Sequence, residues 1–175
     1  VSHYDHGLVG WNSRMGGMEA AYLDLCMDRL DARLESRRRC ASAYREALGA
    51  MGVRAVGPPP DYMENAYLNV TLFDPVLRPT IEESLREQGI GFGTVYPRAM
   101  SEQPGAKDHL LDHVGGRTAA WLGRSVVNLP LFAHIREEEA RMVVEAVRRA
   151  DGGSGLANGS GPGPGRPDRD GRVVQ

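Results

Sequence analysis

The chain has 175 residues, 41% of them hydrophobic and 25% charged, which is long enough for one domain with its own core and short for two. A formal net charge of -2 gives no general attraction to nucleic acid or to an anionic membrane, so any phosphate binding must be local. Because no stretch approaches the roughly 18 apolar residues of a membrane span and no signal segment opens the chain, we expect a cytoplasmic protein without nucleic-acid or membrane partners.

The first predicted elements are a loop over residues 1–17 and a long helix over residues 18–52. Two histidines and several glycines are typical of a loop, whereas apolar residues recur at helical spacing from about Met18 to Ala50. We expect one helix of about 30 residues or two abutting helices. The two cysteines, Cys26 and Cys40, would lie roughly 21 Å apart along one helix, so they cannot form a disulfide with each other.

A small α/β unit is expected over residues 53–150. Residues 56–64 are rich in proline and predict a stiff connector. Residues 78–90 predict a short helix with Thr80 as its N-cap and Gly89 as its stop. Strands are expected at 66–74, 90–97 and 125–132, and a closing amphipathic helix at 136–150. Helices that alternate with strands favour helices packed against one sheet.

Both ends of the chain carry further indications. Residues 151–175 are dense in glycine, proline and serine and hold almost no large apolar residue, so this tail is expected to be disordered. The chain starts at Val1 rather than at methionine, which suggests a piece of a longer protein. A long helix that leads into a small α/β unit often links two lobes, and the other lobe would have to precede residue 1.

Asn12, Ser13 and Arg14 form a polar cluster just before the long helix. A helix N-terminus presents unpaired N–H groups and a partial positive charge, so an amide and a guanidinium in front of it suit a phosphate. The alternative is that Asn12 or Ser13 only caps the helix, a contribution of about 1 kcal/mol, and the residues alone favour this second interpretation.

Two other arginine-bearing segments are candidate sites. The triplet 37–39 consists of three arginines and could grip an anion, but successive helical residues point about 100° apart, so a solvated face is favoured. Tyr96 and Arg98 lie at the end of a predicted strand, where ligands sit in open α/β sheets, and they are candidate contacts for a polar substrate.

Metal and nucleotide-loop sites are not indicated. His109 and His113 have the i,i+4 spacing of a metal-binding pair, but no third ligand is evident and a solvated turn is favoured. The chain also lacks a glycine-rich phosphate loop and the Gly-x-Ser-x-Gly elbow of hydrolases.

Six stretches, taken in order, resemble the C-terminal part of the pyridoxal-phosphate-dependent sugar aminotransferases of the DegT/DnrJ/StrS type, which have the aspartate-aminotransferase-like (type I) fold. The stretches are GWNSRMGGMEAAYL, RLDARLESRRRCASAYREAL, NAYLNVTLF, LREQGIGFGTVYP, NLPLF and EEEARMVVEAVRRA. The resemblance covers residues 7–150. It implies that 1–17 is a loop from a missing cofactor domain, that 18–52 is the interdomain helix and that 53–150 is the small α/β C-terminal domain.

The resemblance implies an enzyme that moves an amino group from an amino acid, commonly glutamate or glutamine, to a keto-sugar, often nucleotide-linked, or to a keto-cyclitol. Such enzymes act in amino-sugar, polysaccharide or antibiotic biosynthesis. They are homodimers and hold pyridoxal 5'-phosphate on a lysine. By resemblance, Asn12 reaches the cofactor phosphate of the neighbouring subunit. Arg14 lies near that site or the substrate, and together with Tyr96 and Arg98 it makes up the expected substrate-binding set.

Departures from the family pattern narrow these expectations. The Schiff-base lysine of the family lies before the Asn12 segment, and the only lysine here, Lys107, matches no catalytic position, so no catalytic residue is assigned. The chain alone is therefore expected not to be a complete transaminase. Val95 and Ser101 stand where the family often has histidines, which alters the usual sugar contacts.

Two alternative functions stay open. A related enzyme of the same fold performs dehydration, with histidine in place of the lysine. A non-catalytic regulatory or interaction module would instead fold alone and bind a protein partner, although an exposed apolar face on the long helix argues against its stability.

Overall fold

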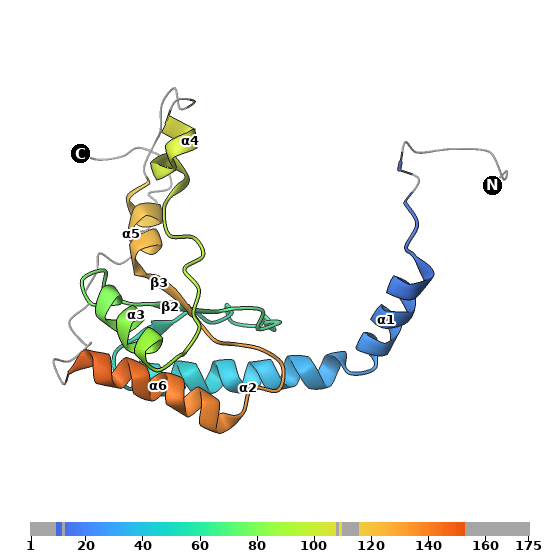
Figure 1. Cartoon of the computed structure of the whole chain (residues 1–175), viewed down its shortest axis with the longest axis horizontal. Coiled ribbons are helices and arrows are strands. Elements are labelled where there is room, and N and C mark those ends of the chain that lie inside the picture. Colours follow the sequence, from blue (N-terminus) through green and yellow to red (C-terminus); the bar gives the residue numbers. More distant parts are fainter. Residues whose placement is uncertain (1–9, 12, 108, 110–115, 153–175) are drawn as a thin grey trace.

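In the computed structural model of the protein, the described residues are 10–11, 13–107, 109 and 116–152 (Figure 1). The elements are, in chain order, α1 (Gly17–Met27), α2 (Leu30–Gly49), β1 (Arg54–Ala55), β2 (Asn69–Leu72), α3 (Arg78–Glu87), the 3-10 turn η1 (Met100–Glu102), α4 (Pro104–Lys107), α5 (Arg117–Ser125), β3 (Val126–Leu129) and α6 (Glu137–Asp151). Within this part of the chain, no helix is long and apolar enough to cross a membrane. Almost all of the predicted disordered tail lies outside the described residues.

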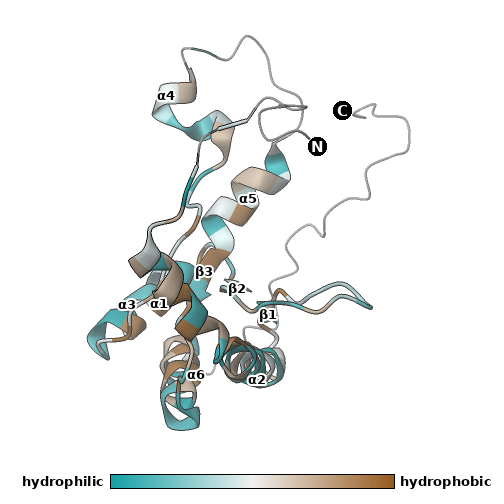
Figure 2. Ribbon diagram, turned by 90° about the vertical axis from the view of Figure 1, so that its right-hand side faces the viewer, coloured by the Kyte–Doolittle hydropathy of each residue, from teal (hydrophilic) through white to brown (hydrophobic). Residues whose placement is uncertain are grey.

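The predicted long helix is present as two helices, α1 and α2, which meet at a break at residues 28–29. Arg29 has φ -115° and ψ 6°, outside the helical range, and α1 turns away from the end of α2 (Figure 1). None of the residues of α1 is buried, and Met18 is 90% exposed. Figure 2 shows apolar residues on α1, and Figure 1 shows that α1 projects from the body. α1 therefore adds almost no packing to the described part of the chain.

The sheet has three antiparallel strands in the order β1-β2-β3. β2 and β3 pair from Asn69 opposite Leu129 to Leu72 opposite Val126. The strands predicted at 66–74 and 125–132 are thus present in shortened form. The strand predicted at 90–97 is wrong, because this segment makes only one isolated bridge, from Gly93 to Asn128, and its glycines offer no side chains to pack on a sheet.

The hydrophobic core lies between the sheet and helices α2, α3 and α6, which gather on one side of it (Figures 1 and 2). Tyr44, Leu85 and Val127 come from α2, α3 and β3, and all three side chains have 0% exposure. Tyr44 also donates a hydrogen bond from its hydroxyl to the Pro130 carbonyl over 3.1 Å, which holds α2 to the segment after β3. The two cysteines are both free, as predicted.

Helix α3 begins at Arg78, so the prediction of Thr80 as its N-cap is wrong. Asp74 organises this start: its carboxylate accepts from the Val76 N–H over 2.7 Å, and its carbonyl accepts from the Arg78 N–H over 2.9 Å. Because of the turn made by Asp74, the helix starts before position 80, where a hydroxyl cap was predicted. Gly89 follows the helix with φ +67°, which confirms it as the stop.

Replacement of Leu85 by alanine should lower the free energy of unfolding by about 2 to 5 kcal/mol, because a fully buried side chain is removed from the core. The matched control is Leu23→Ala on α1, where the side chain is 47% exposed and the expected loss is below about 0.5 kcal/mol. Urea unfolding followed by circular dichroism measures both. Equal losses would contradict the assignment of the core.

Stability should also fall at alkaline pH. Burial raises the pKa of the Cys40 thiol above 9.0 and that of the Tyr44 hydroxyl well above 10.0. The unfolded chain therefore releases these two protons first, so the stability that they contribute is complete below the unfolded pKa values and is lost as pH rises through the folded ones. Unfolding measured from about pH 8 to about pH 11 should show this decline, with a shallower slope in Tyr44→Phe and the full slope in the exposed control Tyr67→Phe.

Candidate functional site

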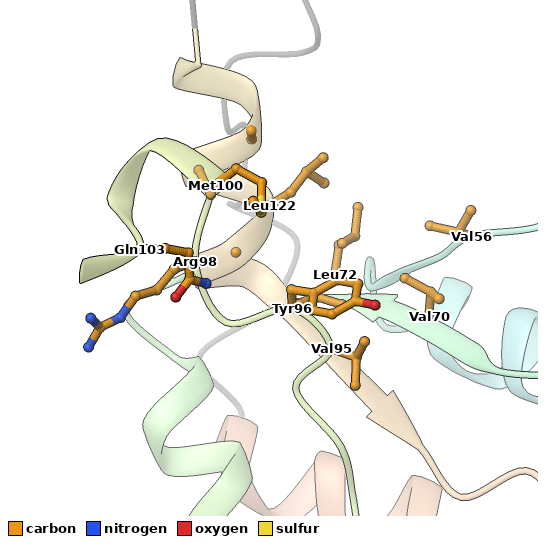
Figure 3. A pocket seen from close by; sticks show the side chains of 13 residues that line it. Val56, Val70, Leu72, Val95, Tyr96, Arg98, Met100, Gln103 and Leu122 are labelled. Carbon is orange, nitrogen blue, oxygen red and sulfur yellow. The ribbon is translucent and has the colours of Figure 1, made fainter. Parts of the chain in front are cut away.

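An open cavity of about 560 Å³ lies on the face of the sheet opposite the core helices (Figure 3). Its volume is in the range of small-molecule sites. The lining comes from β2, the start of β3, the residue after β1, the segment after Thr94 and α5, and consists of Val56, Val70, Leu72, Val95, Tyr96, Arg98, Ala99, Met100, Gln103, Ala119, Leu122, Gly123 and Val126. The walls are mainly apolar, and their polar groups are those of Tyr96, Arg98 and Gln103.

The strand pattern explains why this face is apolar. Along β2, Val70 and Leu72 line the cavity, whereas Thr71 between them faces the core and is fully buried. Thr71 satisfies its hydroxyl by donating to the Asn69 side-chain carbonyl over 2.7 Å, on the same face. The alternation of β2 is therefore reversed: the polar side chains point to the helix side and the apolar ones point to the cavity.

Tyr96 and Arg98 both border the cavity, as expected for substrate contacts, but they do not converge. Figure 3 shows the Tyr96 ring lying toward Leu72 and Val70, while the Arg98 guanidinium points away from them. Both side chains are exposed, and Tyr96 is 76% exposed. The Tyr96 ring thus offers its surface to a ligand in the cavity, whereas the Arg98 guanidinium is directed away from the apolar wall.

Gly123 sets the position of the Arg98 segment. A Cβ added to Gly123 would lie 3.0 Å from the Cα of Arg98 and 3.1 Å from its backbone nitrogen, so α5 approaches this backbone as closely as a glycine allows. The Gly123 carbonyl also accepts a hydrogen bond from Arg78 over 2.7 Å, and Arg78 pairs with Glu82 on α3. These contacts fix the wall of the cavity to the core helices.

The polar cluster before α1 is only partly described. Asn12, the expected cofactor-phosphate residue, lies outside the described residues, and Arg14 is exposed. The capping alternative is wrong for this cluster, because the N-cap of α1 is Gly16. The Gly16 N–H donates to the Glu19 carboxylate over 2.7 Å, so the helix supplies its own capping group.

The remaining sequence-based candidates do not join the cavity. His109 is exposed, and the described residues include no cluster of three potential metal ligands. His113 lies outside the described residues. The arginines of the triplet 37–39 lie on α2, on the opposite side of the sheet from the cavity, and among the described residues only Arg38 and Arg39 have hydrogen-bond or ion-pair partners.

The cavity does not fit pyridoxal phosphate by itself. Its lining holds no lysine and no carboxylate, so it offers neither an amine for a Schiff base nor a partner for a pyridine nitrogen. What it does offer is an apolar surface bordered by hydrogen-bonding groups. This arrangement can bind and orient a ligand, but it holds no evident acid or base for catalysis.

Sequence reasoning found the rim of the cavity and missed its walls. Leu72, Leu122 and Val126 were not singled out because apolar residues of a strand or helix are assigned to the core by default. The signal that could have found them is Thr71 between Val70 and Leu72. Side chains alternate between the two faces of a strand, so a buried Thr71 with apolar neighbours on both sides indicates a sheet covered on both faces.

The comparison with known proteins gives one family. Residues 1–148 match the DegT/DnrJ/EryC1/StrS aminotransferase family. A pleiotropic regulatory protein of Geobacillus stearothermophilus is 31% identical over 151 residues, which are 82% of this chain and 39% of the relative. A UDP-N-acetyl-3-dehydro-alpha-D-glucosamine 3-aminotransferase of Acidithiobacillus ferrooxidans is 28% identical over 149 residues, 83% of this chain and 38% of the relative.

Solved structures agree with the family. Streptomyces venezuelae DesV in complex with a ketimine intermediate has a TM-score of 0.72 and 26% identity, over 85% of this chain and 40% of that chain. A DegT DnrJ EryC1 StrS aminotransferase from Brucella abortus has a TM-score of 0.70 and 23% identity, over 85% of this chain and 39% of that chain, and it shows the shared fold. The chain thus spans about two-fifths of the length of the relatives that it matches.

Replacement of Gly123 by alanine should destabilise the protein by about 1 to 3 kcal/mol, because the new Cβ forces the Arg98 backbone outward. Gly49→Ala is the matched control in another helix: a Cβ there meets nothing within 4 Å, so the expected change is a gain of up to about 1 kcal/mol. Chemical denaturation measures both. A loss in both variants, or in neither, would refute the role of Gly123 as a close-approach residue.

Proposed function

The chain belongs to the DegT/DnrJ/EryC1/StrS aminotransferase family, and we propose on this premise that it is part of an enzyme that transfers an amino group from an amino acid to a keto-sugar. Members of the family are in general dependent on pyridoxal phosphate and dimeric, and relatives include aminotransferases of UDP-linked and dTDP-linked sugars. We propose glutamate or glutamine as the amino donor and a nucleotide-linked keto-sugar, or a keto-cyclitol, as the acceptor.

The observation that carries this proposal is the cavity with Tyr96 and Arg98 at its border. A sugar presents one face of C–H groups and a rim of hydroxyl groups. The Tyr96 ring and the apolar wall of Leu72 and Val126 suit the first, while the Arg98 guanidinium suits the second or a linked phosphate. Val95, in place of a histidine, makes the wall more apolar and favours a sugar with few hydroxyl groups on that side.

The proposed roles follow from the groups that line the cavity and from the catalytic groups that are missing from this lining. The cavity offers no amine and no carboxylate, so the chain contributes the substrate side of a site whose cofactor is held elsewhere in a longer protein. We propose residues 18–52 as the interdomain helix and 53–150 as the small domain. Asn12 of one subunit reaches the cofactor phosphate of the other, and Arg14 lies near that phosphate or binds the substrate.

A non-catalytic function is the second candidate, and one observation favours it. The relative from Geobacillus stearothermophilus that shares 31% identity is called a pleiotropic regulatory protein, a name that describes control rather than transfer. In this alternative, the chain would act through protein contacts, and the apolar side chains exposed on α1 would form the contact surface.

Expression of the complete reading frame that encodes this chain tests the proposal. The purified protein should bind pyridoxal phosphate, seen as a visible absorbance band, and should transfer the amino group of glutamate or glutamine to a dTDP-linked or UDP-linked keto-sugar, followed by mass spectrometry. Asn12→Ala should weaken cofactor binding by about tenfold or more, since a hydrogen bond to a charged group is lost. Ser13→Ala is the adjacent control and should bind normally.

The outcome separates the two candidates. Cofactor binding with no amino transfer to any of these sugars would overturn the proposed substrate class. Failure to bind the cofactor at all, with a stable complex between the chain and another protein, would favour the regulatory alternative. With added cofactor, the 175-residue chain alone should give no absorbance band beyond that of the free cofactor, because its cavity has no amine.

A further inference from the structure

The three arginines of the triplet 37–39 have different surroundings in the structure. Arg38 donates from its Nε to the Glu64 carbonyl over 2.7 Å, and Arg39 pairs with the Glu35 carboxylate over 2.8 Å. Arg37 has neither kind of partner among the described residues. The predicted solvated face therefore describes Arg39 alone, and it does not describe the surroundings of Arg37.

Arg37 lies on the face of α2 that packs against the core. Its i+4 and i+7 neighbours are Ala41 and Tyr44, which are both buried. One turn before Arg37, on the same face, lies Arg33. At this end α2 extends beyond α6 and the sheet toward α1 (Figure 1). The face of α2 that packs against the core therefore carries two arginines where the helix extends beyond the core.

Both side chains are partly buried, and the Nε of each guanidinium lacks an acceptor among the described residues. The Nε atoms of Arg33 and Arg37 have almost no exposure to solvent. The helix itself offers no acid, because the residues three and four positions away on either side of the two arginines are all non-acidic. These are Arg29, Leu30, Leu34, Ser36, Cys40 and Ala41.

This arrangement costs free energy unless an anion completes it. Like charges at i,i+4 on a helix repel each other, and a buried donor without an acceptor loses the hydrogen bond that water had given it. Other arginines of α2 are paired with glutamate, as Arg45 is with Glu64 over 2.7 Å. Arg33 and Arg37 are the exception on this helix.

We propose that Arg33 and Arg37 form a binding site for a phosphoryl anion with at least two negative charges, supplied either as free inorganic diphosphate or as the diphosphate of a nucleotide. Two guanidiniums carry two positive charges, which a dianion balances, whereas a single carboxylate leaves one charge unpaired. Guanidinium also matches phosphate geometry with paired N–H donors, which suits arginine rather than lysine. This site is separate from the cavity and does not rest on the proposed enzymatic activity.

Titration calorimetry on the 175-residue chain, at constant ionic strength, tests the site with three probes: inorganic diphosphate, UDP and succinate. Diphosphate should bind and succinate should bind at least about tenfold more weakly, since it cannot make the same set of charge-assisted contacts. Tighter binding of UDP than of diphosphate identifies a nucleotide as the source of the phosphoryl group. Equal binding of the two identifies the free phosphoryl anion.

Two variants and one control locate the site. The double variant Arg33→Gln with Arg37→Gln should lose diphosphate binding by about tenfold or more. Arg37→Lys keeps the charge and most of the length of the side chain, so it should fold even where the double variant does not, and it should bind about tenfold more weakly because the paired donors are lost. Arg39→Gln, at the exposed pair with Glu35, should bind as the parent chain does.

Three results would overturn the proposal. The first is that diphosphate binds no more tightly than chloride does at the same ionic strength. The second is that the affinity for diphosphate is unchanged in Arg37→Lys and in the double variant. The third is succinate binding as tightly as diphosphate, which would mean that the two arginines receive acidic side chains of a protein partner. None of these outcomes depends on whether the complete protein transfers amino groups.

Discussion

Burial of the three-stranded sheet on both faces is the constraint on which the other features depend. Val127 on one face packs into the core formed with α2, α3 and α6, and Val126 on the other face lines the cavity. A sheet with apolar side chains on both faces needs two covers, because exposed apolar area is costly in water. The second cover consists of α5 and the segment around Tyr96, and it is incomplete. The cavity is the part of the face that it leaves open.

The same core fixes only one half of the long helical arm. Tyr44 and Leu48 anchor the end of α2 near the sheet, whereas the opposite end and all of α1 lie outside the packed region (Figure 1). Tyr22 and Leu25 on α1 are 66% and 68% exposed. Exposed apolar residues in such numbers are typical of a surface that another unit covers. This fits a chain that spans about two-fifths of the length of its relatives.

The sequence was sufficient for elements with strong periodicity and clear stops. The closing helix was predicted at 136–150 and lies at Glu137–Asp151, and the strand before it was found near Val126. Helices α4 and α5 were missed because they are short, with 4 and 9 residues; α5 begins after Gly116, whose φ is +94°, and no side chain caps its start. The partners of the arginines could not be predicted, since Glu64 reaches Arg38 and Arg45 only through the fold of the proline-rich connector.

The cavity and the arginine pair lie in different places, and they also bind ligands through different physical interactions. Binding in the cavity rests on burial of apolar area against Leu72 and Val126, which salt affects little. Binding at Arg33 and Arg37 rests on charge, which salt screens over a length of about 10 Å at moderate ionic strength. The protein therefore has an apolar site fixed to its core and a charged site on the arm that leaves the core. A ligand that carries both an apolar ring and a phosphate could use one of them without the other.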